Sequence, residues 1–265
     1  MPILPEYSLA GRVAILATSG GEEAPVLAQV LAEAGSAVFV LARRRASLEA
    51  VLEALRKTPP LTPPYQGRDG GVSHGGVVAE VATASGLAEA MEAFDRRHGR
   101  VDILVNDARS PFARPFTDIT PEEWDTVQAR NVRATFLLCQ EVGRRMIQQQ
   151  YGRIVNVLSG LAERGMINSA AFSASQAAVL SLTRSLAVEW GRYNIRVNAL
   201  GTGWFTAEDI SLEVQQRELL VRYIPLRRKG HPRDIGPLLV YLCSEACDYS
   251  TGQPVYVDGG LNARP

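Results

Sequence analysis

Neither sign of charge is in excess in this 265-residue sequence. Lysine and arginine together number 28, and aspartate and glutamate also number 28, so the formal net charge is zero. A chain without net positive charge has no general attraction for nucleic acid or for an acidic membrane surface. We therefore expect neither nucleic acid nor a membrane as a partner.

Cysteine and histidine are scarce. The three cysteines, which fall mostly in helix-like context, are too few for a disulfide framework and predict buried thiols in a reducing compartment. They are Cys139, Cys243 and Cys247. None has a histidine nearby in the sequence, so we expect no metal site. The three histidines, His74, His98 and His231, lie in a loop, at a helix end and before a proline, and we expect them at the surface rather than in catalysis.

Long apolar runs are absent as well. No stretch is long enough to span a bilayer, and the first residues, MPILPEYSLAGR, lack the basic and apolar regions of a secretory signal. We therefore expect a cytoplasmic protein. Because 46% of the residues are hydrophobic, the chain can bury a large core, and its length fits a single domain over residues 1–265.

Short β-branched segments alternate with longer helical segments along the chain. The strand-like segments are 13–16, 37–41, 101–105, 153–158, 195–200 and 254–257. The helical patterns are 24–35, 47–57, 87–99, 122–149, a segment from Ala171 onward, and a segment near 233–245. This alternation predicts an α/β fold of the Rossmann type, a doubly wound parallel sheet, and the nearly unbroken apolar strands indicate burial on both faces. We expect the functional site at the carboxyl ends of the strands.

The stretch from 58 to 81 does not follow this alternation. Its prolines and glycines predict an irregular surface loop over about 58–76, followed by a short strand at VVAEV.

The loop after the first strand, ATSGGEEAPVLAQ, has the position of a dinucleotide-binding loop. Glycines in such a loop let a pyrophosphate approach the backbone at the start of the next helix. We expect Ser19, Gly20 and Gly21 to line this site. Glu22 and Glu23 favour the start of the helix, but they oppose a phosphate by about 1 to 4 kcal/mol. The sequence therefore indicates a nucleotide site that is weakened where the phosphates would bind.

Arginines follow the second strand, in LARRRA, at the place where an acidic residue would bind the ribose of NAD. Arg43 and its neighbours are suited to a 2′-phosphate, which favours NADP over NAD. A solvated basic turn fits the same residues equally well. We expect either weak NADP binding or no cofactor, and the sequence leaves both open.

From about Leu9 to Gly260 the chain resembles the short-chain dehydrogenase/reductase family. That family has a TGxxxGxG loop, an NNAG segment, a serine shortly before YxxxK, and a PG pair after VNA. At the corresponding places this chain has ATSGGEEA, NDAR, Ser159 followed by FSASQ, and VNALGTGW. The tail, CDYSTGQPVYVDGG, follows the family pattern closely. The resemblance implies that Asn106 and Ala108, in NDAR, face the cofactor.

The resemblance also implies roles at four catalytic positions. In the family the tyrosine is the acid or base on the substrate oxygen, the lysine lowers the pKa of that tyrosine and holds the nicotinamide ribose, the serine orients the substrate, and a helix asparagine supports a proton relay. Ser159 and Asn131 keep the serine and the asparagine, whereas Phe172 and Gln176 replace the tyrosine and the lysine. A phenyl ring cannot exchange a proton, and loss of a general acid or base typically costs about 10²- to 10⁴-fold in rate. We therefore expect no standard hydride transfer.

Halohydrin dehalogenases are similar to this family in fold, lack the nucleotide loop, and bind halide where the nicotinamide would lie. The altered loop, the aspartate in NDAR and the aromatic pair in GWFTAED are reminiscent of them. Those enzymes keep a serine, a tyrosine and an arginine at the catalytic positions. Only Ser159 is present here, so this resemblance is the weaker one.

Three functions agree with these observations. The first is a binding or assembly subunit, a homodimer or homotetramer or a partner of an active paralogue, which holds a small-molecule ligand in the cleft. The second is an NAD(P)-dependent oxidoreductase that acts on a carbonyl or alcohol with another proton donor. The third is elimination, isomerisation or dehalogenation with Ser159, Asn131 and Arg109 as polar groups. We place the first slightly ahead of the second. On sequence alone we expect Phe172→Tyr with Gln176→Lys to change stability by no more than about 1 kcal/mol.

Overall fold

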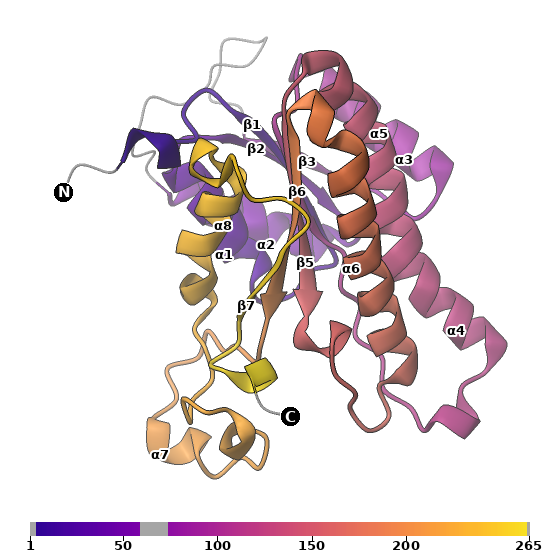
Figure 1. The fold of residues 1–265 in the computed structure, drawn as a ribbon, viewed down its shortest axis with the longest axis vertical. Helices are drawn as coiled ribbons and strands as arrows, with labels where there is room; N and C mark the ends of the chain where they lie inside the picture. Colours follow the sequence, from indigo (N-terminus) through magenta and orange to yellow (C-terminus); the bar gives the residue numbers. More distant parts are fainter. Residues whose placement is uncertain (1–3, 59–73, 264–265) are drawn as a thin grey trace.

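A parallel sheet of seven strands forms the centre of the protein (Figure 1). The computed structural model describes residues 4–58 and 74–263. The strand order is β3-β2-β1-β4-β5-β6-β7, and every neighbouring pair is parallel. The strands are β1 (Val13–Thr18), β2 (Ala37–Ala42), β3 (Gly75–Val78), β4 (Ile103–Asp107), β5 (Gly152–Ser159), β6 (Ile195–Thr202) and β7 (Pro254–Val257). This order confirms the predicted Rossmann-type doubly wound sheet.

Helices cover both faces of the sheet. One face packs against α1 (Ala24–Glu33), α2 (Arg45–Arg56) and α8 (Gly236–Cys243). The other face packs against α3 (Ala84–Asp95), α5 (Ala134–Gln149) and α6 (Ala170–Trp190). The short helices α4 (Pro121–Gln128) and α7 (Leu212–Gln215) lie outside these two layers of buried side chains.

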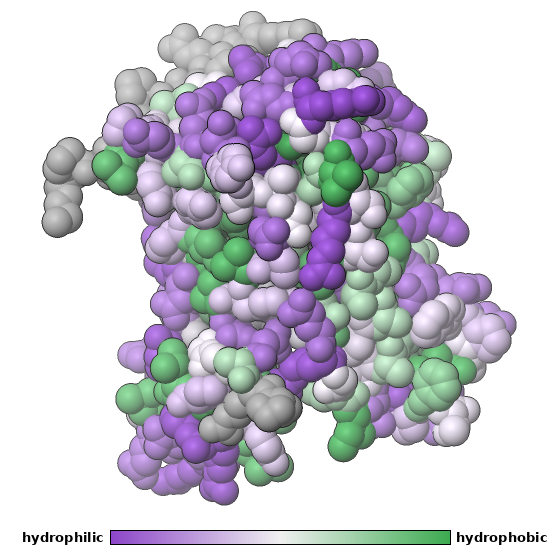
Figure 2. Space-filling view, viewed as in Figure 1, coloured by the Kyte–Doolittle hydropathy of each residue, from purple (hydrophilic) through white to green (hydrophobic). Residues whose placement is uncertain are grey.

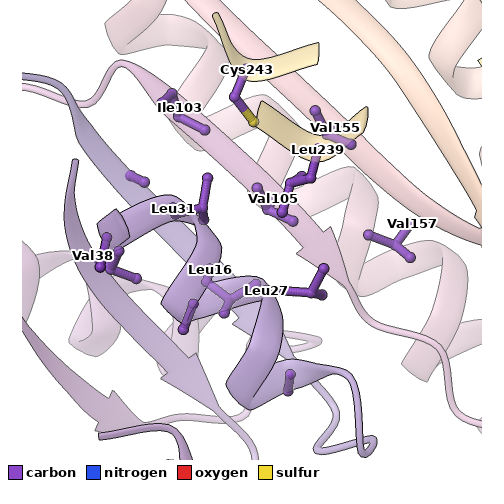
Figure 3. Packing of buried hydrophobic residues seen from close by; sticks show 14 of the residues in the cluster. Leu16, Leu27, Leu31, Val38, Ile103, Val105, Val155, Val157, Leu239 and Cys243 are labelled. Carbon is purple, nitrogen blue, oxygen red and sulfur yellow. The ribbon is translucent and has the colours of Figure 1, made fainter. Parts of the chain in front are cut away.

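The strands are apolar on both faces because each face is covered. In β1, Leu16 packs into the core cluster that contains Leu27 of α1 and Leu239 of α8 (Figure 3). Its neighbour Ile15 points the other way and packs into the core cluster that contains Met146 of α5. Successive side chains of a strand point to opposite faces, so a strand buried on both sides has to be apolar at nearly every position. This is why these segments could be recognised from composition.

The predicted helix over 122–149 is divided into three elements. Thr120 and Glu123 form a capping box at the start of α4, and a π-helical turn, η3 (Ala129–Arg133), separates α4 from α5. Turns of this kind insert an extra residue and are frequent at functional sites. The turn contains Asn131, which it directs into the protein, where the side chain is 2% exposed.

The third strand begins earlier than the sequence indicated. It starts at Gly75, inside the loop predicted over 58–76, and ends at Val78, inside the segment VVAEV. Residues 59–73 of that loop lie outside the described residues. A side chain at Gly76 would approach the carbonyl oxygen of Val40 to 2.6 Å, so this strand requires glycine next to β2. Because glycine is rare in strands, the pattern concealed the start of β3.

His98 contradicts the expectation that all three histidines lie at the surface. Its side chain is fully buried, and its ring lies 5.8 Å from that of Phe39 and 5.1 Å from that of Phe94, measured between centroids. The chain turns back toward the sheet after α3, so the imidazole packs there as an aromatic ring. His74 is half-buried, which lowers its pKa, and His231 is exposed.

The three cysteines are buried free thiols, as predicted. Burial raises the pKa of Cys139 to about 12, so this thiol stays protonated. Within residues 4–58 and 74–263, no helix has the length and apolar character to cross a bilayer. Among these described residues there is also no group of three or more histidine, cysteine, aspartate or glutamate side chains that could hold a metal ion.

Candidate active site

A cavity of about 700 Å³ opens at the carboxyl ends of the strands, where the sequence predicted the site. The strand arrows of β5 and β6 point toward this edge, at the lower end of Figure 1. Figure 2 shows apolar side chains interspersed with hydrophilic ones at the same end, around α7 and below α6. We call the two parts of the cavity the nucleotide half and the substrate half. The nucleotide half is lined by Ser19, Gly20, Gly21, Glu23, Arg43 and Arg44, and the substrate half by Phe112, Ser159, Leu161, Arg164, Met166, Ser169, Phe172, Trp204 and Leu261.

The loop between β1 and α1 is held against the end of β4. The backbone N–H of Ser19 donates to the carbonyl of Asp107 at 2.9 Å, and the Ser19 hydroxyl donates to the carbonyl of Arg109. Gly20 has a φ of +96°, and a β-carbon there would lie 2.1 Å from the Ser47 hydroxyl. Glycine is therefore required at this turn. Ser19, Gly20 and Gly21 line the cavity as the sequence suggested.

The two glutamates of this loop differ in position. Glu22 is exposed and lies outside the cavity lining, whereas Glu23 lines the cavity as the N-cap residue of α1. The Glu23 carboxylate is 3.7 Å from the Arg109 guanidinium. Of the two carboxylates that were expected to repel a phosphate, only that of Glu23 therefore lines the cavity. The nearby Arg109 guanidinium partly neutralises its charge.

Arg109 lines the cavity between the end of β4 and the end of β6. Its Nε donates to Asp107 at 2.7 Å, and its Nη1 donates to the Thr202 hydroxyl at the end of β6. The side chain of Arg109 is 13% exposed and that of Asp107 is 2% exposed. Burial opposes the charge on Arg109, but Asp107 and Glu23 outweigh this effect and raise its pKa. This arginine therefore stays charged and links the β1 loop to the end of β6.

Truncation of Arg109 is expected to destabilise the protein strongly. Arg109→Ala leaves Asp107 as an uncompensated buried carboxylate, which typically costs about 3 kcal/mol or more. Adding Asp107→Asn removes that charge. The free energy of unfolding of the double variant should therefore lie within about 1 kcal/mol of that of the unmodified protein. Arg45→Ala is the matched control, because Arg45 is 85% exposed and pairs only loosely with Glu49. Urea denaturation measures the free energy of unfolding of the three variants. An Arg109→Ala variant as stable as Arg45→Ala would contradict the stabilising role of the Arg109–Asp107 ion pair.

Ser159 and Phe172 lie at the cavity, whereas Gln176 does not line it. Ser159 ends β5, and its hydroxyl accepts a bond from the Leu161 N–H at 3.3 Å. Phe172, in the first turn of α6, presents its ring to the substrate half and is 7% exposed. Gln176 is 2% exposed, and its Oε1 accepts from the Ser159 N–H at 3.0 Å. The residue at the lysine position is thus used to fasten α6 to the end of β5.

Asn131 is also engaged behind the cavity wall. Its Oδ1 accepts from the Ser110 N–H at 2.7 Å, and its Nδ2 donates to the Ser175 hydroxyl at 2.9 Å. Its backbone carbonyl accepts from the Thr135 hydroxyl at 2.8 Å. Asn131 therefore positions the loop after β4 and is absent from the cavity lining, and the relay role that the resemblance implied stays a prediction.

The other predicted cofactor residues fall in three places. Arg43 lines the nucleotide half, where burial and the neighbouring Arg130 lower its pKa. Ala108 lines a small adjoining cavity together with Arg43. Asn106 lies in the core, donating to Asn156 at 2.8 Å, and does not reach either cavity. The Asn106 amide thus belongs to a buried bond between β4 and β5, and its predicted place beside a cofactor stays a prediction.

Sequence reasoning missed Arg164 and did not anticipate the link between Arg109 and Thr202. Arg164 lies between β5 and α6, and its Nη1 donates to the Leu261 carbonyl at 3.1 Å. Both arginines follow the carboxyl end of a strand, which is the one signal in the sequence that marks them. Their partners come from segments far away in the chain, so the pairs become visible only in the fold.

The chain is similar to several known proteins. A family model described as enoyl-(acyl carrier protein) reductase matches residues 24–262. The chain is 32% identical to 2-dehydro-3-deoxy-D-gluconate 5-dehydrogenase of Dickeya dadantii, over 99% of this chain and 100% of that protein. Among solved structures it is similar to a gluconate 5-dehydrogenase from Burkholderia cenocepacia in complex with NADP and tartrate, with 30% identity, a TM-score of 0.82 and 98% of both chains covered. A putative NAD(P)-dependent gluconate 5-dehydrogenase from Beutenbergia cavernae with bound NADP has 34% identity and a TM-score of 0.82, with 98% of this chain and 100% of that chain covered.

Proposed function

This chain belongs to the short-chain dehydrogenase/reductase family of NAD(P)-dependent oxidoreductases, and on that premise we propose that it binds an organic ligand in its cleft without tyrosine-dependent hydride transfer. It does so as a subunit of an assembly, either with copies of itself or with an active relative. The observation that carries the proposal is the wall of the substrate half. At the place of the acid or base stands the ring of Phe172, and the neighbouring Ser159 has no base beside it among the described residues.

The carboxylates of the cavity do not replace the missing tyrosine. Asp107 and Glu23 are the acidic residues of its lining, and both lie within ion-pair distance of Arg109. A general base needs a free lone pair within reach of the substrate proton. Both carboxylates lie beside the Arg109 guanidinium, an arrangement that supports a binding role for the cleft.

An NADP-dependent oxidoreductase acting on a carbonyl or alcohol with another proton donor is the second candidate. Arg43 and Arg44 line the nucleotide half, where a 2′-phosphate would find two cations. The relatives favour this candidate over the first, since they are dehydrogenases by description and two of the solved structures carry NADP. Dehalogenation or isomerisation has less support, because Asn131 is absent from the cavity lining and Arg109 is paired with two carboxylates.

A turnover assay separates the two candidates. Purified protein is incubated with NADPH and a panel of simple ketones, and absorbance of the reduced nicotinamide is followed. We expect no oxidation above the rate of a no-protein control. Turnover that is abolished by Ser159→Ala would reject the first proposal and establish the second.

The protein is expected to form at least a dimer of closed symmetry. Apolar side chains are exposed on the two helices that carry the family's interfaces: Phe136 on α5 is 44% exposed and Val188 on α6 is 87% exposed. Exposed apolar side chains at such positions mark contact surfaces. Light scattering at micromolar concentration measures the mass. Val188→Glu should lower that mass, whereas Leu212→Glu, at an exposed leucine of α7, should not. A strictly monomeric unmodified protein would contradict the expectation.

A further inference from the structure

The substrate half of the cavity has an unusually apolar wall for a site that would hold a sugar acid. Six apolar side chains line it, contributed by the loop after β4, the segment between β5 and α6, the start of α6, the loop after β6 and the C-terminal turn. They are Phe112, Leu161, Met166, Phe172, Trp204 and Leu261. Apolar walls of this kind bind the apolar body of a ligand and leave few partners for hydroxyl groups.

Two hydroxyl groups near this wall already take part in hydrogen bonds within the protein. The Ser159 hydroxyl accepts from Leu161, and the Thr202 hydroxyl accepts from Arg109 and donates to the Leu158 carbonyl at 3.3 Å. A polyhydroxylated ligand would lose water contacts at the hydroxyls that face the apolar side chains, and a hydroxyl buried without a partner is unfavourable. The wall therefore discriminates against ligands that carry many hydroxyl groups.

One cation remains available in the substrate half. Arg164 lines the cavity and is half-buried, and its Nη1 donates to the Leu261 carbonyl. No carboxylate among residues 4–58 and 74–263 forms an ion pair with it, in contrast to Arg109. The planar guanidinium has further N–H groups in a fork that matches a carboxylate.

We infer that the substrate half binds a monoanionic carboxylate with an apolar body, an arylalkyl or branched acyl acid, whose carboxylate is bound by Arg164. The inference rests on the proposed function, since it names the ligand class of the same cleft. A single carboxylate matches the single unpaired cation, because the charge of Arg109 is already balanced by Asp107 and Glu23. The ligand class thus differs from the gluconate for which several relatives are named.

Calorimetry with three probes tests this inference on the unmodified protein. The probes are 3-phenylpropionate, its neutral amide with the same apolar body, and D-gluconate, which has a carboxylate and many hydroxyl groups. We expect 3-phenylpropionate to bind at least about tenfold more tightly than either of the others. Arg164→Gln should remove about tenfold of the affinity for 3-phenylpropionate and leave that for the amide unchanged, whereas Arg164→Lys should retain part of it. Arg184→Gln is the matched control, because Arg184 is an exposed α6 arginine that is not part of the cavity lining.

Each outcome is decisive for the ligand class. Gluconate binding as tightly as 3-phenylpropionate would overturn the inference and leave the proposed binding function intact. Equal binding of the acid and the amide, or no loss in Arg164→Gln when circular dichroism reports a folded variant, would remove Arg164 as the anion site. No binding of any probe at about 10 mM would also overturn the inference. NADPH turnover in the separate assay above would reject the proposed function whatever these probes do.

Discussion

NADPH is expected to bind this protein with a dissociation constant of about 1 mM or weaker, roughly a hundredfold above the ~10 μM of a working cleft. A hundredfold change corresponds to about 2.7 kcal/mol. The Glu23 carboxylate faces the nucleotide half at the start of α1, and a like charge within a few ångströms of a phosphate costs about 1 to 4 kcal/mol. Arg109 would also have to leave Asp107 and Thr202 if the dinucleotide crosses the cavity centre. The two effects together are large enough to produce the expected weakening.

Variants of the loop identify the cause of the weak binding. Glu23→Ile removes the carboxylate that lines the cavity and should tighten NADPH binding about tenfold or more. Glu22→Ala is the matched control, since Glu22 carries the same charge one residue away but is exposed and does not line the cavity. Adding Asp107→Asn and Arg109→Gly, which restores the NNAG pattern, should tighten binding further. A low-micromolar dissociation constant for the unmodified protein by calorimetry would refute this account and favour the oxidoreductase candidate.

The fold was predictable because burial on both faces makes the central strands recognisable as short apolar segments. Leu16 and Ile15 point to opposite sides of the sheet, and both sides are covered. The start of β3 was not predictable, because the close approach of β2 requires glycine at Gly76, and glycine does not indicate a strand. The π-helical turn around Asn131 leaves no mark in the apolar pattern, since the helical period continues on both sides of it.

The site was predictable in its position but not in its contacts. Ser159 and Phe172 were located through the resemblance to the family's serine and YxxxK positions, and only the edge of the sheet was expected from the way parallel strands end. The partners of Gln176 and Arg109 depend on which groups the fold brings near them. Gln176 accepts from the Ser159 backbone, and Arg109 joins Glu23 to Thr202. No local pattern distinguishes a glutamine that binds a ligand from one that binds the backbone.

Phe172→Tyr combined with Gln176→Lys is expected to cost about 2 kcal/mol of stability, more than the limit of about 1 kcal/mol that the sequence suggested. Phe172→Tyr adds one hydroxyl at the cavity wall and should be nearly neutral. Gln176→Lys removes the oxygen that accepts from the Ser159 N–H, and it places an ammonium group where the present side chain is 2% exposed. Lysine has no acceptor, so that N–H loses its partner. Gln140→Lys, the same exchange at an exposed position of α5, is the matched control and should change stability by less than about 0.5 kcal/mol.

Rebuilding the two catalytic positions should not by itself produce activity. Hydride transfer requires a bound nicotinamide, and in the double variant Glu23 and Arg109 still occupy the nucleotide path. We therefore expect no ketone reduction by Phe172→Tyr with Gln176→Lys, and measurable reduction when Glu23→Ile, Asp107→Asn and Arg109→Gly are added. Urea denaturation must first confirm that both variants are folded. Reduction by the folded double variant alone would mean that the loop already binds cofactor, because a restored tyrosine and lysine have no hydride to use without it. An inactive but folded rebuilt variant that binds NADPH would instead place the defect in the substrate half of the cavity.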